Sequence, residues 1–521
     1  MRTKLTMYET IKGIDDDDHQ WREKKDIESA LQISRSSFPP DKERLVSLDV
    51  FRGLTVALMI LVDDAGGILP AINHSPWDGL TLADFVMPFF LFIVGVSLAF
   101  AYKNLSCRLA ATRKASMRSL KLLLLGLFLQ GGFIHGLNNL TYGIDVDKIR
   151  FMGILQRIAI AYLVAALCEM WLKGSHNVSS ELSMIRKYRF HWMVAFVFTT
   201  IYLSLLYGLY VPDWEYQISS EDQGSSTFLN LKVKCGVRGH TGPGCNAVGM
   251  IDRMFLGIQH LYRKPVYART KQCSVNSPNN WPLPPDAPSW CQAPFDPEGL
   301  LSSLMATVTC LVGLHYGHII IHFKDHKQRL NQWILRSFCL LMFGLALDLF
   351  GMHLNKPLYT LSYMCVTSGA SGFLLSAIYL MVDVYGYKRA SLVLEWMGVH
   401  ALPIFVLIAC NLVFLIIHGF YWKKPINNLV TSFNWNRKIK KRRQGKGGDQ
   451  TLSFMNQKLK CFIIKKQMPY SSSHPTLFHF HIHVGSNLCY FYKWNLIIFH
   501  ILFFYVFMIF SRDACETKPL T

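Results

Sequence analysis

The stretch LVDDAGGILPAINHSPWDGLTLADFVMPFF (residues 61–90) links two long apolar segments and carries several ionisable side chains where they meet. Asp63 and the acid after it close the first segment, and Asp84 lies near the start of the second. Two glycines and a proline between the segments predict the end of a helix, with His74 on the connecting loop. Because that loop is short, the two helices are expected to run antiparallel and to pack together. The stretch therefore predicts a helical hairpin that gathers three acids and a histidine at one end.

Long apolar runs recur along most of the chain. Of 521 residues, 51% are hydrophobic, and the mean hydropathy is +0.22. A run of about 18 apolar residues or more is long enough to cross a bilayer as a helix. The runs lie at 54–69, 82–102, 120–133, 151–171, 192–210, 300–321, 334–350, 361–382 and 401–420, with a weaker one at 496–510. The sequence thus predicts an all-α, polytopic transmembrane helix bundle of about nine or ten spans.

Positive charge sorts the connecting loops into two classes. The loops after the second, fourth, sixth and eighth runs are rich in Lys and Arg, whereas residues 71–81 around His74 contain neither. Short basic loops stay on the cytosolic side of a membrane. Residues 1–44 are polar and lack the apolar core of a signal peptide. We therefore expect residues 1–44 to form a cytosolic tail and His74 to lie on the far, extracytoplasmic side.

Residues 211–298 form the longest segment between two apolar runs, and the same topology places them outside. The segment contains Cys235, Cys245, Cys273 and Cys291. Four cysteines in an oxidising compartment predict two disulfides, for which three pairings are possible. A zinc site is the alternative, but the segment has no CxxC pair. We therefore expect one extracytoplasmic loop that carries two disulfides.

The character of the chain changes after Asn428. Residues 429–521 combine a polybasic stretch, a stretch of alternating histidine and aromatic residues, and one weak hydrophobic run. Three interpretations compete: a lipid-binding basic run, a metal site on the histidines, and sequence foreign to the fold that replaces its natural end. We favour the third, because the basic cluster would fall outside, against the charge rule. Much of the net charge of +20 lies in this tail, so that charge does not indicate a nucleic-acid partner.

Ionisable side chains near hydrocarbon are costly and persist there mainly with a partner or a function. A histidine beside a carboxylate can act as a general base whose pKa and tautomer the carboxylate sets. It can also act as a nucleophile that takes an acyl group and passes it on. The structural alternative is that Asp63 and Asp84 are paired polar groups and that His74 only caps a loop. Buried Asp and His also relay protons in transporters, so the residues alone leave these roles open.

Five segments in matching order carry a resemblance to a known family. They are RLVSLDVFRGLTVALMILVDDAGG (44–67), NHSPWDGLTLADFVMPFFLFIVGVSLAFA (73–101), GILQRIAIAYLVAAL (153–167), FDPEGLLSSLMATVTCLVGLHYGHII (295–320) and NKPLYTLSYMCVTSG (355–369). Together they resemble the catalytic domain of the heparan-alpha-glucosaminide N-acetyltransferase family of transmembrane acyltransferases, and most of all its plant-type members. The resemblance covers about residues 45–428, which we interpret as the transmembrane acyltransferase domain. The tail at 429–521 does not resemble the family.

The resemblance implies acetyl transfer from cytosolic acetyl-CoA to a lumenal amino sugar or other glycan acceptor. The active histidine of the family matches His74. The family's partner residue is an asparagine eleven positions earlier, where this chain has Asp63. An asparagine can donate a hydrogen bond to a developing oxyanion, whereas an ionised aspartate would repel it. We therefore expect His74 and Asp63 to be the catalytic pair, with Asp63 orienting the histidine or donating only if it is protonated.

The phosphates of the donor need positive charge, and three arginines at helix ends or in the interior could supply it. These candidate cofactor-binding residues are Arg52, Arg150 and Arg157. Arg52 could instead pair with Asp49 at the inner end of its helix, which we favour. Glu298 is expected to cap the N-terminus of the helix that follows it.

The remaining expectations concern partners and location. We expect a lipid bilayer and a glycan acceptor as partners, no metal, no nucleic acid, and a homodimer as one option. The resemblance implies a multi-pass protein of the endomembrane system, in the lysosome or vacuole, the Golgi or the plasma membrane, with its N-terminus in the cytosol. Two alternatives to the enzyme stay open: a proton-coupled small-molecule transporter, and a catalytically inactive member of the family.

Overall fold

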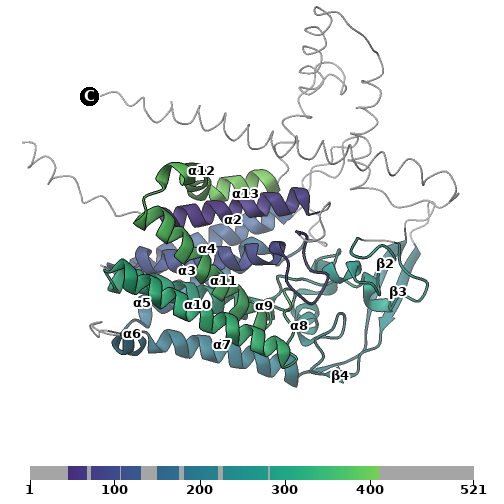
Figure 1. Cartoon of the computed structure of the whole chain (residues 1–521). Helices are drawn as coiled ribbons and strands as arrows, with labels where there is room; N and C mark the ends of the chain where they lie inside the picture. Colours follow the sequence, from purple (N-terminus) through teal and green to yellow (C-terminus); the bar gives the residue numbers. More distant parts are fainter. Residues whose placement is uncertain are drawn as a thin grey trace, which may run out of the picture. The chain divides into compact units, whose positions relative to one another are not determined.

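The computed structural model describes residues 45–66, 72–105, 107–130, 149–174, 181–220, 227–279 and 282–409. The chain divides into two units, Met1–Val46 and Ser47–Thr521, and the helical bundle belongs to the second. Figure 1 shows the long helices of this bundle lying side by side, with a small region containing strands at one end. The helices are α2 (Val46–Ala65), α3 (Leu82–Ala101), α4 (Arg108–Gln130), α5 (Ile154–Trp171), α6 (Glu181–Lys187), α7 (Arg189–Gly208), α8 (Ala247–Leu256), α9 (Leu300–His322), α10 (His326–Leu349), α11 (Leu361–Tyr379), α12 (Lys388–Val399) and α13 (Ala401–Ala409).

Six helical segments among the described residues are long and apolar enough to cross a membrane. They are α3, α5, α7, α9, α10 and Leu361–Val384, in which α11 continues into the π-helical turn η5 (Leu380–Val384). The number rises to seven if Ser391–Val399 and Ala401–Ala409 form one span, although they are bent by 74° at their junction. The expected polytopic, all-α bundle is thereby confirmed, and the protein is a multi-pass membrane protein.

Two predicted spans differ from the helices that contain them. The run predicted at 54–69 belongs to α2, which starts earlier, at Val46, and includes four charged side chains. The run predicted at 120–133 belongs to α4, whose first half, from Arg108, is basic. Backbone hydrogen bonding continues a helix past the point where the apolar run ends, so helix bounds and apolar runs do not coincide. Most of the run predicted at 401–420, and all of the one at 496–510, lie outside the described residues.

The centre of the bundle is α9, which is buried along most of its length and packs closely against α3. Glycines make that close approach possible. A Cβ atom on Gly95 of α3 would lie 2.0 Å from the backbone oxygen of Cys310, and one on Gly313 of α9 would lie 2.2 Å from that of Phe92. Small residues of this kind let helix backbones touch inside a membrane, where van der Waals packing drives association.

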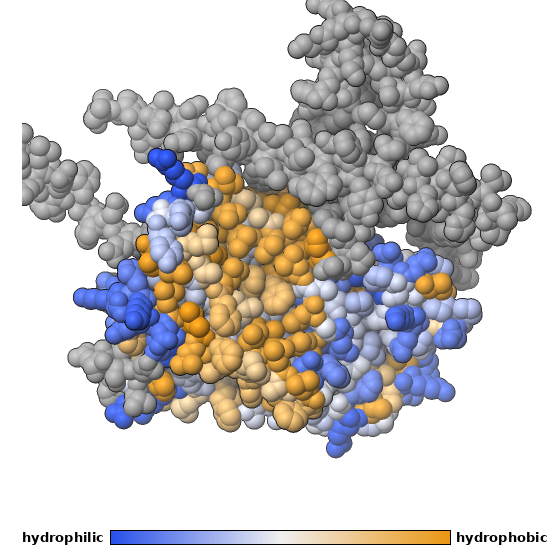
Figure 2. Space-filling model, in the orientation of Figure 1, coloured by the Kyte–Doolittle hydropathy of each residue, from blue (hydrophilic) through white to orange (hydrophobic). Residues whose placement is uncertain are grey.

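A broad apolar band covers the face of the bundle in Figure 2, and polar residues gather on both sides of it. Helices α7 and α10 contribute large exposed apolar side chains, among them Phe196 and Phe343. Exposed apolar area on this scale is unusual for a soluble protein but is what a bilayer would cover. The polar margins lie at the two ends of the helices, as expected of a bundle that crosses a membrane.

The segment between α7 and α9 folds into a compact region with two small antiparallel sheets. Strand β1 (Tyr210–Val211) pairs with β4 (Val237–Arg238), and β2 (Trp214–Ser220) pairs with β3 (Thr227–Val233). Disulfides join Cys235 to Cys245 and Cys273 to Cys291. The expectation of two disulfides is confirmed, and the pairing that the sequence left open is between neighbours in the chain.

Candidate active site

Asp84 anchors the site at the first turn of α3. Its side chain is fully buried, and its Oδ2 atom accepts hydrogen bonds from the backbone N–H and the hydroxyl of Thr81, at 3.1 and 2.9 Å. This arrangement is a capping box, in which the residue at the helix N-cap and the acid three positions later satisfy each other. The backbone N–H of Ser75 also donates to Oδ2, at 3.2 Å. Helix capping thus holds the carboxylate in one orientation, with Oδ1 directed at the loop that carries His74.

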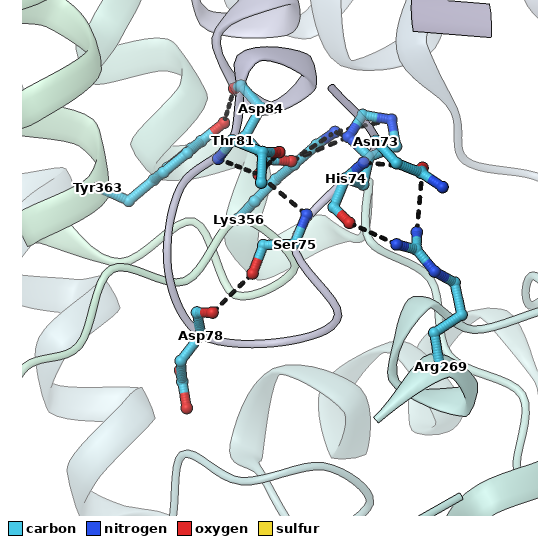
Figure 3. A network of polar contacts seen from close by, with 9 residues as sticks. All are labelled: Asn73, His74, Ser75, Asp78, Thr81, Asp84, Arg269, Lys356 and Tyr363. Carbon is cyan, nitrogen blue, oxygen red and sulfur yellow. Dashed lines mark hydrogen bonds and ion pairs between the residues drawn. The ribbon is translucent and has the colours of Figure 1, made fainter. Parts of the chain in front are cut away.

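The ring of His74 meets this carboxylate directly. Nδ1 of His74 lies 2.9 Å from Oδ1 of Asp84 (Figure 3). Because an ionised carboxylate only accepts hydrogen bonds, the proton of this pair belongs on Nδ1, which leaves the lone pair of the neutral ring on Nε2. Contact with Asp84 thereby favours the tautomer and the orientation that a histidine base requires.

Lys356 completes the group from the loop between α10 and α11. Its Nζ atom lies 2.8 Å from Nδ1 and 3.4 Å from Nε2 of His74, and 3.5 Å from Oδ1 of Asp84. With the proton on Nδ1, the ammonium pairs with the carboxylate of Asp84 and does not donate to that nitrogen. Burial lowers the pKa of His74 below its ordinary value of 6.5, and the Lys356 ammonium lowers it further, against the opposing effect of Asp84. Burial also lowers the pKa of Lys356. The arrangement therefore favours a neutral imidazole, the form that can accept a proton.

Two other segments hold the His74 loop in place. The guanidinium of Arg269, from the disulfide-bearing region, donates to the backbone oxygen of His74 at 2.8 Å and to Oδ1 of Asn73 at 3.1 Å (Figure 3). The side-chain amide of Asn355, next to Lys356, donates to the backbone oxygen of Trp77 at 3.2 Å. The loop is thus tied both to the extracytoplasmic region and to the loop that supplies Lys356.

His74 and Lys356 line a cavity of about 280 Å³. Its other walls come from α4, α5, α13 and the segment before α9. They include Ser75, Gly126, Leu129, Arg150, Ile154, Leu155, Gln156, Tyr262, Val266, Pro297, Glu298, Pro357, Phe405 and Ala409. An apolar cavity with a few convergent polar groups is the usual form of a small-molecule site, and this one lies at the small end of their size range.

The predicted acids lie in different places. Of the three, Asp84 contacts His74, whereas Asp63 is exposed near the end of α2, and the side chain of Asp64 is outside the described residues. The expectation that all three acids gather around His74 is therefore met by Asp84 alone among those whose side chains are described. Trp77 is buried and donates from Nε1 to the backbone oxygen of Thr241, at 3.2 Å. The catalytic role of Asp63 stays a prediction.

The three predicted phosphate-binding arginines have protein partners. Arg150 forms a two-point ion pair with Asp296, through Nε at 2.8 Å and Nη2 at 2.5 Å, and also contacts Glu298. Arg157 is buried, donates to the backbone oxygen of Pro297 and the hydroxyl of Ser302, and lies over the ring of Tyr359 at 5.3 Å. These contacts give both arginines structural roles, and their assignment to the donor stays a prediction.

Near the start of α2, at the end away from His74, Arg52 forms the expected pair with Asp49, at 2.8 Å. The guanidinium also donates to the hydroxyl of Ser97 on α3, at 3.1 Å. Arg52 therefore links the start of α2 to the end of α3. The favoured structural interpretation, a pair with Asp49, is confirmed.

The helix after Glu298 is capped by a different acid. Oδ1 of Asp252, from α8, accepts a hydrogen bond from the backbone N–H of Leu300 at 2.8 Å. Glu298 instead pairs with Arg150. The expectation that Glu298 caps α9 is not met, because a buried acid that is distant in sequence occupies that position.

Comparison with known proteins points to one family. A model of the family described as heparan-alpha-glucosaminide N-acetyltransferase, catalytic, matches residues 44–207. The heparan-alpha-glucosaminide N-acetyltransferase of Mus musculus is 28% identical over 372 residues, which cover 66% of this chain and 50% of that protein. That of Homo sapiens is 28% identical over 380 residues, which cover 67% of this chain and 50% of that protein. The chain is thus similar to the heparan-alpha-glucosaminide N-acetyltransferases, through the family segment at 44–207 and through two curated relatives.

The chain spans about half the length of the curated relatives that it matches. The matched family segment, 44–207, contains His74 and Asp84 together with the helices that flank the cavity, α4 and α5. Lys356 and Arg269 lie beyond it. The candidate site is thus built on the segment that matches the family model and is completed by two later loops.

Sequence reasoning missed Lys356 and Arg269. Lys356 follows an asparagine between two apolar runs, and a charge at that position is a signal that could have been weighed. Arg269 is one of several basic residues in a long loop, and nothing in the sequence distinguishes it from the others. Only the fold brings either residue to His74.

A second buried polar cluster lies at the other end of the same helices. Glu169 of α5 is 1% exposed and accepts from Nε2 of His318 on α9, at 2.7 Å, and from Nζ of Lys173, at 3.0 Å. His191 of α7 lies 3.4 Å away, and Tyr188 stacks on His318. Glu169, His191 and His318 come from three helices that are far apart in sequence, so no single segment of the sequence reveals the cluster.

Proposed function

We propose that the chain is a membrane acetyltransferase in which His74 is the general base, oriented by Asp84. The observation that carries this proposal is the 2.9 Å contact between His74 Nδ1 and Asp84 Oδ1 at the wall of a cavity. Similarity to the family supports acetyl transfer as the reaction, and the name of the relatives indicates a glucosaminide acceptor. In this proposal residues 45–428 are the acyltransferase domain, the donor is cytosolic acetyl-CoA, and an amino sugar or other glycan binds on the lumenal side.

The proposed reaction is a direct transfer. The nitrogen of the acceptor amine attacks the thioester carbonyl, a C–N bond forms, and the C–S bond breaks to release the thiolate of coenzyme A. Nε2 of His74 takes the proton that the amine loses, and Asp84 stabilises the resulting imidazolium through Nδ1–H. The acceptor must be unprotonated to attack, so a base that is neutral near pH 7 suits the step.

Lys356 is the proposed electrostatic partner of this base. Its ammonium touches the imidazole and lines the same cavity. A cation at this place would stabilise the negative charge that develops on the carbonyl oxygen, the role for which an asparagine is expected in the family. An acetylated histidine intermediate is the alternative route, and a histidine held by a carboxylate can serve either.

The direct test is acetyl transfer in purified membranes. Radiolabelled acetyl-CoA and glucosamine are supplied to membranes that carry the native chain or His74→Ala, with the exposed Lys327→Ala as a matched control. We expect N-acetylglucosamine from the native chain and the control, and a loss of at least about a hundredfold with His74→Ala. Equal product from native and His74→Ala membranes would contradict the proposal.

One observation favours a second candidate, a proton-coupled transporter. The buried Glu169–His318 pair could relay protons at the opposite end of the bundle from His74. Uptake of radiolabelled glucosamine into sealed vesicles, driven by a pH gradient and without acetylated product, would establish the transporter in place of the enzyme. The lumenal placement of the acceptor, the cytosolic N-terminus, the endomembrane location and a homodimer belong to the proposal and stay predictions.

A further inference from the structure

Gln156 lines the same cavity as His74, and its amide group has no hydrogen-bond partner among the residues that the structure describes. The residue follows Leu155 in the first turn of α5 and is 2% exposed. Both amide atoms, Nε2 and Oε1, are buried without a partner. Buried polar side chains in native proteins are almost always hydrogen-bonded, so an unpaired donor and acceptor on one side chain indicate a partner other than the described residues.

The neighbouring helix α4 leaves room for this amide. A Cβ atom on Gly126 of α4 would lie 2.4 Å from Oε1 of Gln156. Glycine at this position therefore leaves the space that the amide occupies. The amide is held at the boundary of α4 and α5, within the cavity wall that also carries His74 and Lys356.

We propose that Gln156 binds two adjacent hydroxyl groups of the acceptor and thereby selects a sugar over a simple amine. This inference rests on the proposed function. The amide presents one donor and one acceptor side by side, which matches neighbouring hydroxyls that each donate and accept. A thioester carbonyl only accepts, so the donor's acyl group would leave Oε1 unpaired.

The size and walls of the cavity agree with a single sugar unit. At about 280 Å³ the cavity is at the small end of ligand sites, too small to enclose a whole coenzyme A molecule but large enough for a monosaccharide. Tyr262 and Phe405 contribute aromatic surface to the wall, against which the apolar face of a sugar ring can pack. His74 in the same wall is then available to the amine of that ring.

The test compares two acceptors that differ only in the hydroxyls. Acetyl transfer to glucosamine and to 3,4-dideoxyglucosamine is measured for the native chain and for Gln156→Met, which keeps the side-chain length and loses both hydrogen bonds. We expect KM for glucosamine to rise about tenfold with kcat nearly unchanged, and KM for the dideoxy sugar to stay the same. An equal change for both acceptors, or no change for either, would overturn the inference.

Two additions keep the test decisive. Gly126→Ala retains Gln156 but crowds its amide, so it should raise KM for glucosamine selectively even if Gln156→Met fails to fold. Thermal stabilisation of the purified protein by glucosamine is a second readout that needs no turnover. If the native chain makes no acetyl product, the proposed function fails, yet stabilisation of the native protein that is lost in Gln156→Met still supports the sugar contact. Equal stabilisation of both would overturn it.

Discussion

His74 lies between the carboxylate of Asp84 and the ammonium of Lys356, and their opposing effects set the pH at which the imidazole can accept a proton. Asp84 contacts Nδ1 at 2.9 Å and favours the charged ring, whereas burial and the nearby Lys356 favour the neutral one. The pKa of His74 lies below its ordinary value of 6.5 as a result. A carboxylate, a histidine and a lysine in one contact group therefore form a base whose strength depends on all three.

The pH dependence of acetyl transfer should report this balance. The acid limb of kcat at saturating glucosamine, which excludes titration of the free amine, should have its midpoint below 6.5 in the native chain, because the depressed pKa keeps the imidazole neutral at lower pH. Lys356→Met removes the cation and should move that midpoint upward, even if the rate itself falls. The exposed Lys327→Met should leave the midpoint unchanged. A midpoint that stays in place in Lys356→Met would show that the lysine does not act on His74.

Asp252 is a buried acid with consequences for stability. Burial raises its pKa from 3.8 to about 7, and its Oδ1 accepts the backbone N–H of Leu300 at the start of α9. Between these two pH values the folded protein holds a proton that the unfolded chain has lost. Stability must then fall as pH rises from about 4 to about 7.

Asp252→Asn should remove that dependence. The amide keeps an oxygen for the N–H of Leu300 and carries no charge at any pH. We expect the Tm of the native protein in detergent to fall more between pH 5 and pH 8 than the Tm of Asp252→Asn. Asp286→Asn, at an exposed position, serves as the control and should follow the native protein. Parallel behaviour of all three proteins would show that Asp252 is ionised in the fold.

Residue identity alone could not assign a role to each acid. The sequence placed Asp63, Asp64 and Asp84 near His74 because they flank one short loop. The capping box at Thr81 turns Asp84 inward, whereas Asp63 is exposed near the end of α2. A pattern of apolar and polar residues predicts that acids share an end of a hairpin, but capping geometry decides which of them meets the histidine.

Among the elements, the packed pair of α3 and α9 positions residues of the site at the N-terminal ends of both helices. Asp84 begins α3, and the segment before α9 supplies Glu298 to the cavity. The two helices touch through glycines, and a Cβ atom on Gly95 would lie 2.0 Å from the backbone oxygen of Cys310. A shift of either helix would move the carboxylate relative to the cavity.

Gly95→Ala should therefore destabilise the protein and weaken the site together. A methyl group against rigid backbone forces the helices apart, and such overpacking costs about 1–3 kcal/mol. We expect a lower Tm and a reduced rate of acetyl transfer. Gly208→Ala, at the end of α7 where an added Cβ meets nothing within 4 Å, should change neither. A Tm equal to that of the native protein would show that α3 and α9 can separate without cost.

Element types followed from the sequence more closely than element bounds did. Apolar runs of membrane length predicted α3, α5, α7, α9, α10 and α11 because the bilayer leaves no alternative to helices that satisfy their own backbone. The same criterion misplaced the starts of α2 and α4, whose first turns are polar or basic. Short sheets in residues 211–298 also went unpredicted, since only the folded loop brings β1 to β4.

On the scale of the whole molecule, two polar clusters occupy opposite ends of the same helices. The His74 group lies at the N-terminal ends of α3, α5 and α9, and Glu169 with His318 lies at the C-terminal ends of α5 and α9. At 1.5 Å per residue, His318 is about 27 Å along α9 from Leu300, close to the thickness of a bilayer core. The distribution of Lys and Arg among the loops predicted which helix ends lie on the same side of the membrane. It did not predict the second cluster, because its members meet only when the helices pack together.

The central claim is that the carboxylate of Asp84 orients His74 for catalysis. The most direct measurement compares Asp84→Asn with Asp63→Asn for acetyl transfer to glucosamine in the same membranes, at equal amounts of folded protein. The contact between Asp84 and Nδ1 predicts a loss of at least about a hundredfold for Asp84→Asn, because Nδ1 loses its carboxylate partner, and a smaller loss for Asp63→Asn. A large loss with Asp63→Asn beside a near-native Asp84→Asn would contradict the account.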